Sequence, residues 1–219
     1  MSKIHAAPIV ADVSADDRPL IERAQRGDGA AFGELVKKYQ RRVYSTAFHM
    51  TGNHGDADDV AQDAFLRAYR AIRTFDGRAD FFTWLYRIVV NVSLNALRAR
   101  KHTFPSANPA GDDGGRPDPR PGPAAYAEGR ELVTLVVRAL ASLPDAIRMT
   151  LILATLEDMP YRQIAETLEI PEGTVAWRIN QGRKLLRKKL ASVAPDAPAW
   201  AQGTADDLLR RSREAIGAP

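Results

Sequence analysis

The chain has 219 residues, of which 45% are hydrophobic and 26% charged, and its formal net charge is +4. These proportions are those of an ordinary globular protein, so we expect a packed core and exclude wholesale disorder. The sequence contains no cysteine, which excludes disulfides, thiolate nucleophiles and cysteine-ligated zinc sites.

The first part of the chain predicts a helical domain over residues 16–103, preceded by an N-terminal extension, residues 1–15. Apolar residues recur in this domain at intervals of three and four, which is the spacing of amphipathic helices, and strand-like alternation is absent. The expected helical stretches are residues 32–47, 56–74 and 81–100, and the residues at 51–53 favour a turn after the first.

The start of the second expected helix is acidic. Residues 56–63 carry four carboxylates and no cation. Carboxylates near a helix N-terminus are stabilised by the helix dipole, so part of this cluster is explained by capping. The spacing and the central glycine of a calcium loop are missing, which excludes that site. We favour a surface that docks a basic protein partner.

Five aromatic residues lie among basic and amide side chains in residues 75–95. Phe81 fits the apolar face and is expected in the core, whereas Phe82 breaks that pattern and is expected to be exposed in a loop. Arg87 and Asn91 are four residues apart, and a second asparagine follows at 95, so these side chains share one helix face. This face either contacts unstacked single-stranded bases, which aromatic and amide groups suit, or is a solvated polar stripe.

Prolines and glycines crowd residues 104–127, which predicts a flexible linker rather than a helix. A second helical domain is expected over residues 128–194, followed by a C-terminal tail, residues 195–219. The tail segment 205–216 has two alternatives, one amphipathic helix or a frayed terminus. The helices expected in the second domain are residues 128–141, 144–157, 161–168 and about 173–190.

The last two of these helices have the pattern of a helix-turn-helix. Residues 174–190 carry six basic residues and no acidic one, and the second helix of such a motif enters the major groove of DNA. There Arg178 can address guanine and Gln181 adenine. The alternative is a helical hairpin with a solvated basic face. Glu169 stands in the turn, where glycine is common because a left-handed backbone costs other residues about 1 kcal/mol.

The charge is distributed in blocks that the net value conceals. Residues 64–103 carry eight basic and two acidic residues, so each domain holds one block of net charge +6. Clustered lysine and arginine along helices are typical of nucleic-acid binding.

The sequence resembles a known family. The runs DADDVAQDAFLRAYRAI and FDGRADFFTWLYRIVVNVSLNALRAR are similar to region 2 of an extracytoplasmic-function (ECF, group 4) sigma factor of the sigma-70 family. The run LPDAIRMTLILATLEDMPYRQIAETLEIPEGTVAWRINQGRKLLRKKL is similar to region 4 of that family. The resemblance implies an all-α protein with two small helical domains, a region 2 bundle and a region 4 helix-turn-helix, joined by the Pro/Gly-rich linker.

The resemblance also implies roles for particular residues. The surface expected to bind the β′ coiled coil of core RNA polymerase comprises Asp58, Asp59, Gln62, Asp63, Leu66 and Arg67. The residues expected at the −10 element and in its melting, partly on a loop over residues 76–83, are Arg78, Asp80, Phe82, Thr83, Trp84, Arg87, Asn91, Asn95 and Arg98. The residues expected at the −35 element are Thr174, Ala176, Trp177, Arg178, Gln181, Arg183 and Lys184.

The resulting expectation is a cytoplasmic transcription initiation factor with no catalytic residue, metal or cofactor. Its expected partners are core RNA polymerase, through the β′ coiled coil and the β flap, promoter DNA and an anti-sigma factor. No segment reads as a signal peptide or a membrane span, so no membrane contact is expected. One alternative is a helix-turn-helix regulator that binds duplex DNA without polymerase. Another is a metal-dependent nuclease using the carboxylates of residues 56–63, although the four histidines are scattered.

Overall fold

The computed structural model describes residues 13–103, 124–193 and 203–217. Most of the expected extension, residues 1–12, and the linker residues 104–123 lie outside the described residues, as do residues 194–202. Within the described ranges the ordered elements are helical. They are α1 (Val13–Gln25), α2 (Gly29–Thr51), α3 (His54–Ala71), the 3-10 helix η1 (Ile72–Thr74), α4 (Phe81–Thr103), α5 (Ala124–Ala141), α6 (Asp145–Thr155), α7 (Tyr161–Leu168), α8 (Glu172–Val193) and α9 (Ala205–Gly217).

The ends of α2 follow from the residues that flank it. Asp28 is the N-cap, and its carboxylate accepts hydrogen bonds from the backbone N–H groups of Ala30 and Ala31. The hydrogen bond from Ala31 and the ion pair with Arg23 lower the pKa of Asp28. Gly52 ends the helix in the left-handed conformation with φ 84°, which confirms the turn predicted after this helix.

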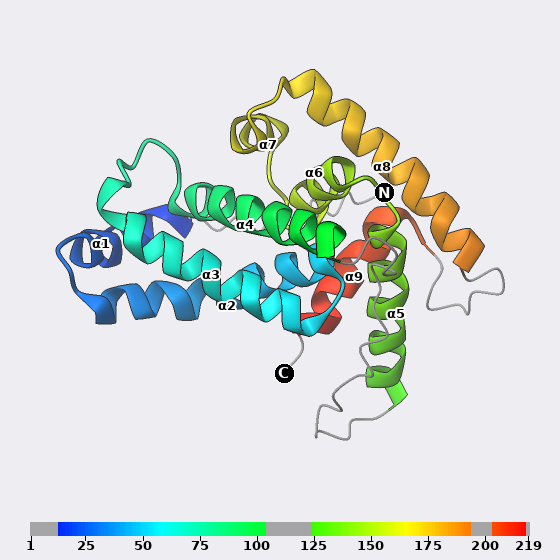
Figure 1. Cartoon of the computed structure of the whole chain (residues 1–219), viewed down its shortest axis with the longest axis horizontal. Helices are drawn as coiled ribbons and strands as arrows, with labels where there is room; N and C mark the ends of the chain where they lie inside the picture. The colour runs from blue at the N-terminus through cyan, green and yellow to red at the C-terminus, as the bar shows by residue number, and fades with distance from the viewer. Residues whose placement is uncertain (1–12, 104–123, 194–202, 218–219) are drawn as a thin grey trace, which may run out of the picture.

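The first group of helices, α1 to α4, surrounds a core centred on α2 and α4. Leu35 and Tyr39 of α2 and Leu85 and Tyr86 of α4 are buried in one core, and Phe81 is buried as predicted, with its ring 5.6 Å from that of Tyr39 between centroids. In Figure 1 the axes of α2, α3 and α4 run along the length of the molecule, α5 runs across them, and α8 forms the outer edge.

The second group of helices, α5 to α8, matches the expected elements closely, except that α5 begins at Ala124, inside the stretch predicted to be linker. Pro144 and Pro160 stand at the N-caps of α6 and α7, where proline needs no backbone donor. Gly182 brings α8 against α6, because a Cβ at this position would lie 3.1 Å from Ile147 Cγ2 and 3.3 Å from Leu151 Cδ2.

The two groups meet along α2 through buried polar contacts. Glu157, which follows α6, accepts hydrogen bonds from Thr46 Oγ1 at 2.5 Å and Arg42 Nε at 3.1 Å. Arg148 of α6 is also buried and donates to the backbone oxygen of Met50 at 2.5 Å. We call this set of contacts the seam. It unites the predicted domains into one packed body in which a single hydrophobic core runs through both groups.

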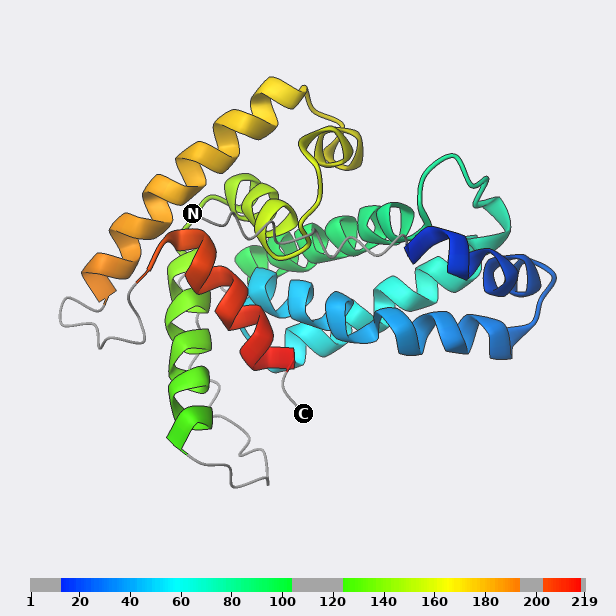
Figure 2. The same cartoon turned by 180° about the vertical axis from the view of Figure 1, so that it is seen from behind.

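The tail segment forms α9, which decides between the two alternatives for residues 205–216. Thr204 and Asp207 cap this helix reciprocally, since each side chain accepts a hydrogen bond from the backbone N–H of the other. The apolar face of α9, with Leu208 and Leu209 buried, packs mainly on α5 and also reaches α2. Figure 2 shows α9 in red between α5 and α2.

No helix in the described parts of the chain is both long enough and apolar enough to cross a membrane.

A buried histidine joins α2 to α9. Nδ1 of His49 lies 2.7 Å from the backbone oxygen of Ser45, and Nε2 lies 3.0 Å from Ser212 Oγ. The carbonyl can only accept, so Nδ1 carries the proton and Nε2 accepts from the serine hydroxyl. Burial lowers the pKa of His49 to about 4, from an ordinary value of 6.5.

This geometry predicts a pH dependence of stability. Between pH 6.5 and about 4 the unfolded chain protonates His49 and the folded chain does not. The free energy of unfolding therefore falls as the pH drops through this window, by about 2 kcal/mol between pH 7.5 and pH 5 from this residue. Urea unfolding at both pH values checks it, and His49→Gln should lose that share of the dependence. An equal decrease in parent and variant would contradict it.

Candidate nucleic-acid and protein interfaces

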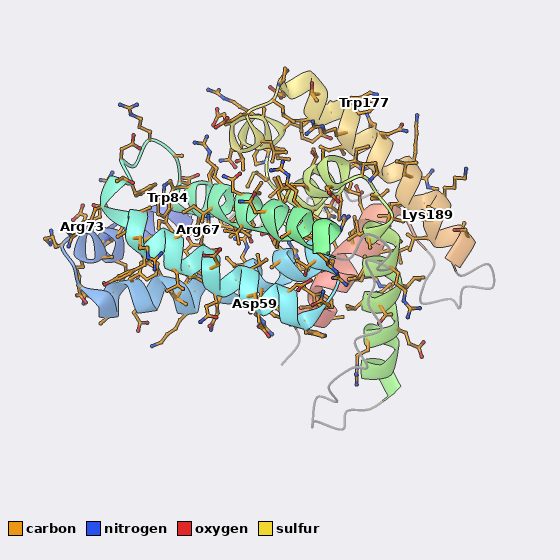
Figure 3. The ribbon with its side chains drawn as sticks, in the orientation of Figure 1. Asp59, Arg67, Arg73, Trp84, Trp177 and Lys189 are labelled. Carbon is orange, nitrogen blue, oxygen red and sulfur yellow. The ribbon has the colours of Figure 1, made fainter. Side chains whose placement is uncertain are left out.

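The outer face of α3 carries the residues expected to bind a protein partner. Asp58, Asp59 and Gln62 are exposed, and the side chain of Leu66 is 49% exposed. Asp63 and Arg67 form an ion pair of 2.9 Å on the same face. Figure 3 shows Asp59 and Arg67 on this helix. The structure therefore brings all six predicted residues together on one surface, with the acidic groups on the N-terminal side of Leu66.

Tyr69 extends this surface and was not among the residues predicted from the sequence. The residue is 45% exposed, and its ring lies 5.0 Å from the ring of Phe32 between centroids. It follows Leu66 by three residues, so the two exposed side chains are neighbours on the helix. A tyrosine outside the apolar face of a predicted amphipathic helix was the available signal.

The loop between η1 and α4, residues 75–80, is held from α1. Gln25 Nε2 donates to the backbone oxygens of Ile72 at 3.1 Å and Phe75 at 2.7 Å. A cavity of about 310 Å³ opens between the loop and α1, lined by Arg18 and Asp80 among others. The sequence did not indicate this cavity, because its walls come from segments about 50 residues apart.

Two residues placed in this loop by prediction belong to the helix instead. α4 begins at Phe81, so Phe82 and Thr83 are helical. Phe82 is only partly exposed. Its ring centroid lies 4.2 Å from that of Tyr86, and the guanidinium carbon of Arg42 lies 3.9 Å from the Phe82 ring. Thr83 is 2% exposed. The predictions of an exposed Phe82 and of a loop reaching Thr83 were wrong, because packing on α2 overrides the local apolar pattern.

The remaining −10 candidates divide into residues exposed to solvent and residues whose side chains contact other parts of the protein. Arg78 has a side chain 90% exposed and is paired with Asp76 at 3.2 Å, and Asp80 is exposed. Asn91, Asn95 and Arg98 are exposed along α4.

Two other −10 candidates are engaged within the protein. Trp84 is half-buried, with its ring centroid 5.2 Å from that of Phe75. Arg87 crosses to the second group of helices, where its Nη2 donates to the backbone oxygen of Glu166 on α7 at 3.1 Å.

The helix-turn-helix forms as the pattern predicts. Ile164 of α7 and Val175 and Ile179 of α8 are fully buried at the crossing. Glu169 ends α7 in the left-handed conformation, with φ 54° and ψ 46°, and the backbone N–H of Ile170 returns to Ala165 O at 3.0 Å. The left-handed residue expected in the turn is therefore Glu169 itself.

The −35 candidates lie along α8 and differ in exposure. Trp177 is 60% exposed near the start of the helix, and Figure 3 shows it at the outer edge of the molecule. Lys184 is exposed. The half-buried candidates are Thr174, Ala176, Arg178 and Gln181.

Arg183, a further −35 candidate, is engaged by the tail. Its Nε and Nη2 donate to the two carboxylate oxygens of Asp206 on α9, at 2.9 and 2.6 Å. The ion pair with Asp206 raises the pKa of Arg183.

The carboxylates at the start of α3 are not arranged for metal binding. Asp56 pairs with Arg100 at 2.9 Å and accepts a hydrogen bond from Asn53 Nδ2 at 2.6 Å. Across the described residues, no group of three or more histidine and acidic side chains could hold a metal ion.

Two family models match the chain. The model described as Sigma-70 region 2 matches residues 35–103, which span most of α2 together with α3 and α4. The model described as Sigma-70, region 4 matches residues 134–186, which include α6, α7 and most of α8. Helix α9 lies beyond both matches.

Curated relatives align over most of their length. The chain is 37% identical over 180 residues to the ECF RNA polymerase sigma-E factor of Escherichia coli strain K12, covering 80% of this chain and 94% of that protein. It is 35% identical over 197 residues to the RNA polymerase sigma-H factor of Pseudomonas aeruginosa, covering 83% of this chain and 97% of that one.

Solved structures share the fold. CnrH, in complex with the cytosolic domain of CnrY, superposes with a TM-score of 0.61 at 25% identity, covering 83% of this chain and 99% of that chain. The sigma factor RpoE of Bartonella quintana, in complex with the anti-sigma factor NepR, gives a TM-score of 0.56 at 19% identity, covering 73% and 96%. The second likeness shows the fold alone.

The strained turn of the helix-turn-helix yields a stability prediction. Because Glu169 is exposed and left-handed, Glu169→Gly should stabilise the protein by about 1 kcal/mol. Glu166→Gly, at an exposed helical position one turn earlier, should destabilise it by about the same amount. Urea unfolding measures both changes, and a change of the same sign in the two variants would refute this account of the turn.

Proposed function

The chain belongs to the ECF sigma factors of the sigma-70 family, RNA polymerase-binding transcription initiation factors, and we propose that it directs core polymerase to promoters through separate −10 and −35 readers. The observation that carries this proposal is the pairing, on one chain, of two basic helical surfaces with an acidic and apolar α3 face. A stand-alone regulator needs one DNA-reading helix, and it has no use for the second reader or for this face.

We assign polymerase docking to the outer face of α3. Exposed Leu66 and Tyr69 supply an apolar patch, and Asp58, Asp59 and Asp63 place negative charge on its N-terminal side along α3. This arrangement resembles a protein interface with an anchoring core and a charged rim. In the family the corresponding partner is the β′ coiled coil, while region 4 meets the β flap.

We assign −10 recognition and melting to the loop 75–80 and the exposed side of α4. Asn91 and Arg78 are exposed and can meet the phosphates and edges of unpaired bases, Arg78 by exchanging its exposed ion pair with Asp76 for a phosphate. The cavity between the loop and α1 offers a place for one base that has left the stack. Unstacking costs a few kcal/mol per base, which contacts of this kind offset.

We assign −35 recognition to the N-terminal half of α8. Arg178 and Gln181 have the donors and acceptors to read guanine and adenine in the major groove, and Trp177 can contact a thymine methyl. The exposed Lys184 and the basic residues beyond it suit phosphates, which position the helix without specifying sequence.

We also propose an anti-sigma factor as a regulatory partner, since a protein of the same fold was solved with one bound. The chain acts through the polymerase, without chemistry of its own. Because core polymerase and the chromosome share the bacterial cytoplasm, we place its activity there.

The α3 assignment predicts a specific loss of polymerase binding. Asp59→Ala with Asp63→Ala should weaken affinity for core RNA polymerase by about tenfold, or about 1.4 kcal/mol, because both carboxylates lie on the docking face. Co-purification and fluorescence titration with core measure it. The matched control is Glu34→Ala with Glu131→Ala, which removes two exposed carboxylates from α2 and α5. Equal affinity for both double variants would argue against the assignment.

The α4 assignment predicts a defect in opening rather than in duplex binding. Arg87→Ala with Asn91→Ala should reduce permanganate reactivity of −10 thymines about tenfold or more, while closed-complex formation by holoenzyme changes less than threefold. Arg130→Ala, an exposed arginine on α5, serves as the charge control. Parent-like reactivity in the double variant would remove Arg87 and Asn91 from the melting step.

A further inference from the structure

Helix α9 contacts both groups of helices. Its buried face packs on α5, where a Cβ at Gly129 would lie 3.4 Å from Ala215 Cβ. Its Ser212 bonds His49 on α2, and Arg213 donates to the backbone oxygen of Leu156 and lies 3.5 Å from Asp158. Helix α9 is therefore bonded to α2 of the first group and to the segment that follows α6 of the second.

The same helix also pairs with Arg183, a cation of the helix to which the proposed function assigns DNA reading. Asp206 holds the guanidinium of Arg183 through two parallel hydrogen bonds, at 2.9 and 2.6 Å. Paired donors of this geometry suit the oxygens of a phosphate as well as those of a carboxylate. The carboxylate thus takes the place that a promoter phosphate would take on Arg183.

The arrangement that α9 supports also brings the two readers together. Arg87 of the −10 helix donates to the backbone oxygen of Glu166 on α7, the first helix of the −35 reader. Two elements separated along a duplex cannot both be met while the readers touch. The 20 residues between α4 and α5 can span up to roughly 65 Å when extended, so the covalent connection permits separation.

We propose that α9 is an intramolecular clamp that holds the two DNA-reading groups together and keeps Arg183 from DNA until polymerase and promoter displace it. The biological role of this clamp rests on the proposed function. Its two structural features, the contact between the two groups of helices and the pairing of Arg183 with Asp206, can be tested without transcription.

The contacts of the clamp suit release. Asp206 and Arg183 are both partly exposed, with side-chain exposures of 27% and 36%. Such a pair contributes little net stability, and salt or a competing anion weakens it. A row of promoter phosphates can therefore replace one carboxylate, whereas the apolar contacts of Leu208 and Leu209 must separate for α9 to leave.

Removal of α9 tests the closed body directly. Because the chain has no cysteine, Gln40→Cys on α2 and Ala191→Cys on α8, both exposed, provide two unique spin-label sites. Double electron–electron resonance should give one narrow distance in the full chain and a longer, broader distribution after deletion of residues 203–219. Circular dichroism reports whether the shortened chain keeps its other helices. An unchanged narrow distance in a folded deletion variant overturns the clamp.

The masked arginine is tested in the full chain, where folding is not at risk. Asp206→Asn should raise affinity for a short random-sequence DNA duplex about fivefold at low salt, and steepen the slope of log affinity against log salt by about 0.9, the value of one added phosphate contact. Glu214→Gln removes the same charge from an exposed position of α9 and should leave the slope unchanged.

A double variant assigns the gain to Arg183. Adding Arg183→Ala to Asp206→Asn should cancel the increase in affinity and slope. Persistence of the gain without Arg183, or an equal gain in Glu214→Gln, overturns the clamp.

Loss of core-dependent transcription by the parent protein would instead refute the proposed function. The distance and duplex-binding results would still stand by themselves, so the two failures are distinguishable.

Discussion

The structure depends on the burial of one carboxylate between its two groups of helices. The Glu157 side chain is 1% exposed, and such a charge is costly unless it is fully bonded. Its partners, Arg42 and Thr46, both come from α2, more than 100 residues earlier in the chain. Arg148 of α6 donates a hydrogen bond to the backbone oxygen of Met50 on α2. These bonds fix the position of α6 on α2, and with it the places of α7, α8 and α9.

A polar seam has a functional consequence that an apolar one lacks. When two apolar surfaces part, both are exposed to water at a cost proportional to their area. Arginine, glutamate and threonine can instead regain hydrogen bonds with water, so the polar contacts of this junction cost less to separate than the hydrophobic core that also runs through both groups. Polar contacts of this kind suit the proposed use of two DNA-reading groups at separated promoter elements.

The sequence predicted the features that local patterns determine. Apolar spacing located α2, α3, α4 and the helix-turn-helix, and turn chemistry located Gly52 and the left-handed Glu169. Contacts between distant segments have no such signal. The bond between Arg42 and Glu157 and the pair between Arg183 and Asp206 could not be predicted, because no spacing rule joins them. The sequence also left the choice between a helix and a frayed terminus for residues 205–216 undecided. A 13-residue helix is marginally stable alone, and α9 forms here by packing on α5.

Run-off transcription from a random-promoter library, with purified core RNA polymerase and this protein, distinguishes a polymerase-dependent initiation factor from a stand-alone DNA-binding regulator. The account predicts initiation only when both are present, and selected promoters that share two short elements at a fixed separation. Specific binding of the isolated protein to a duplex, with no initiation in the presence of core, would contradict it and would identify a stand-alone regulator.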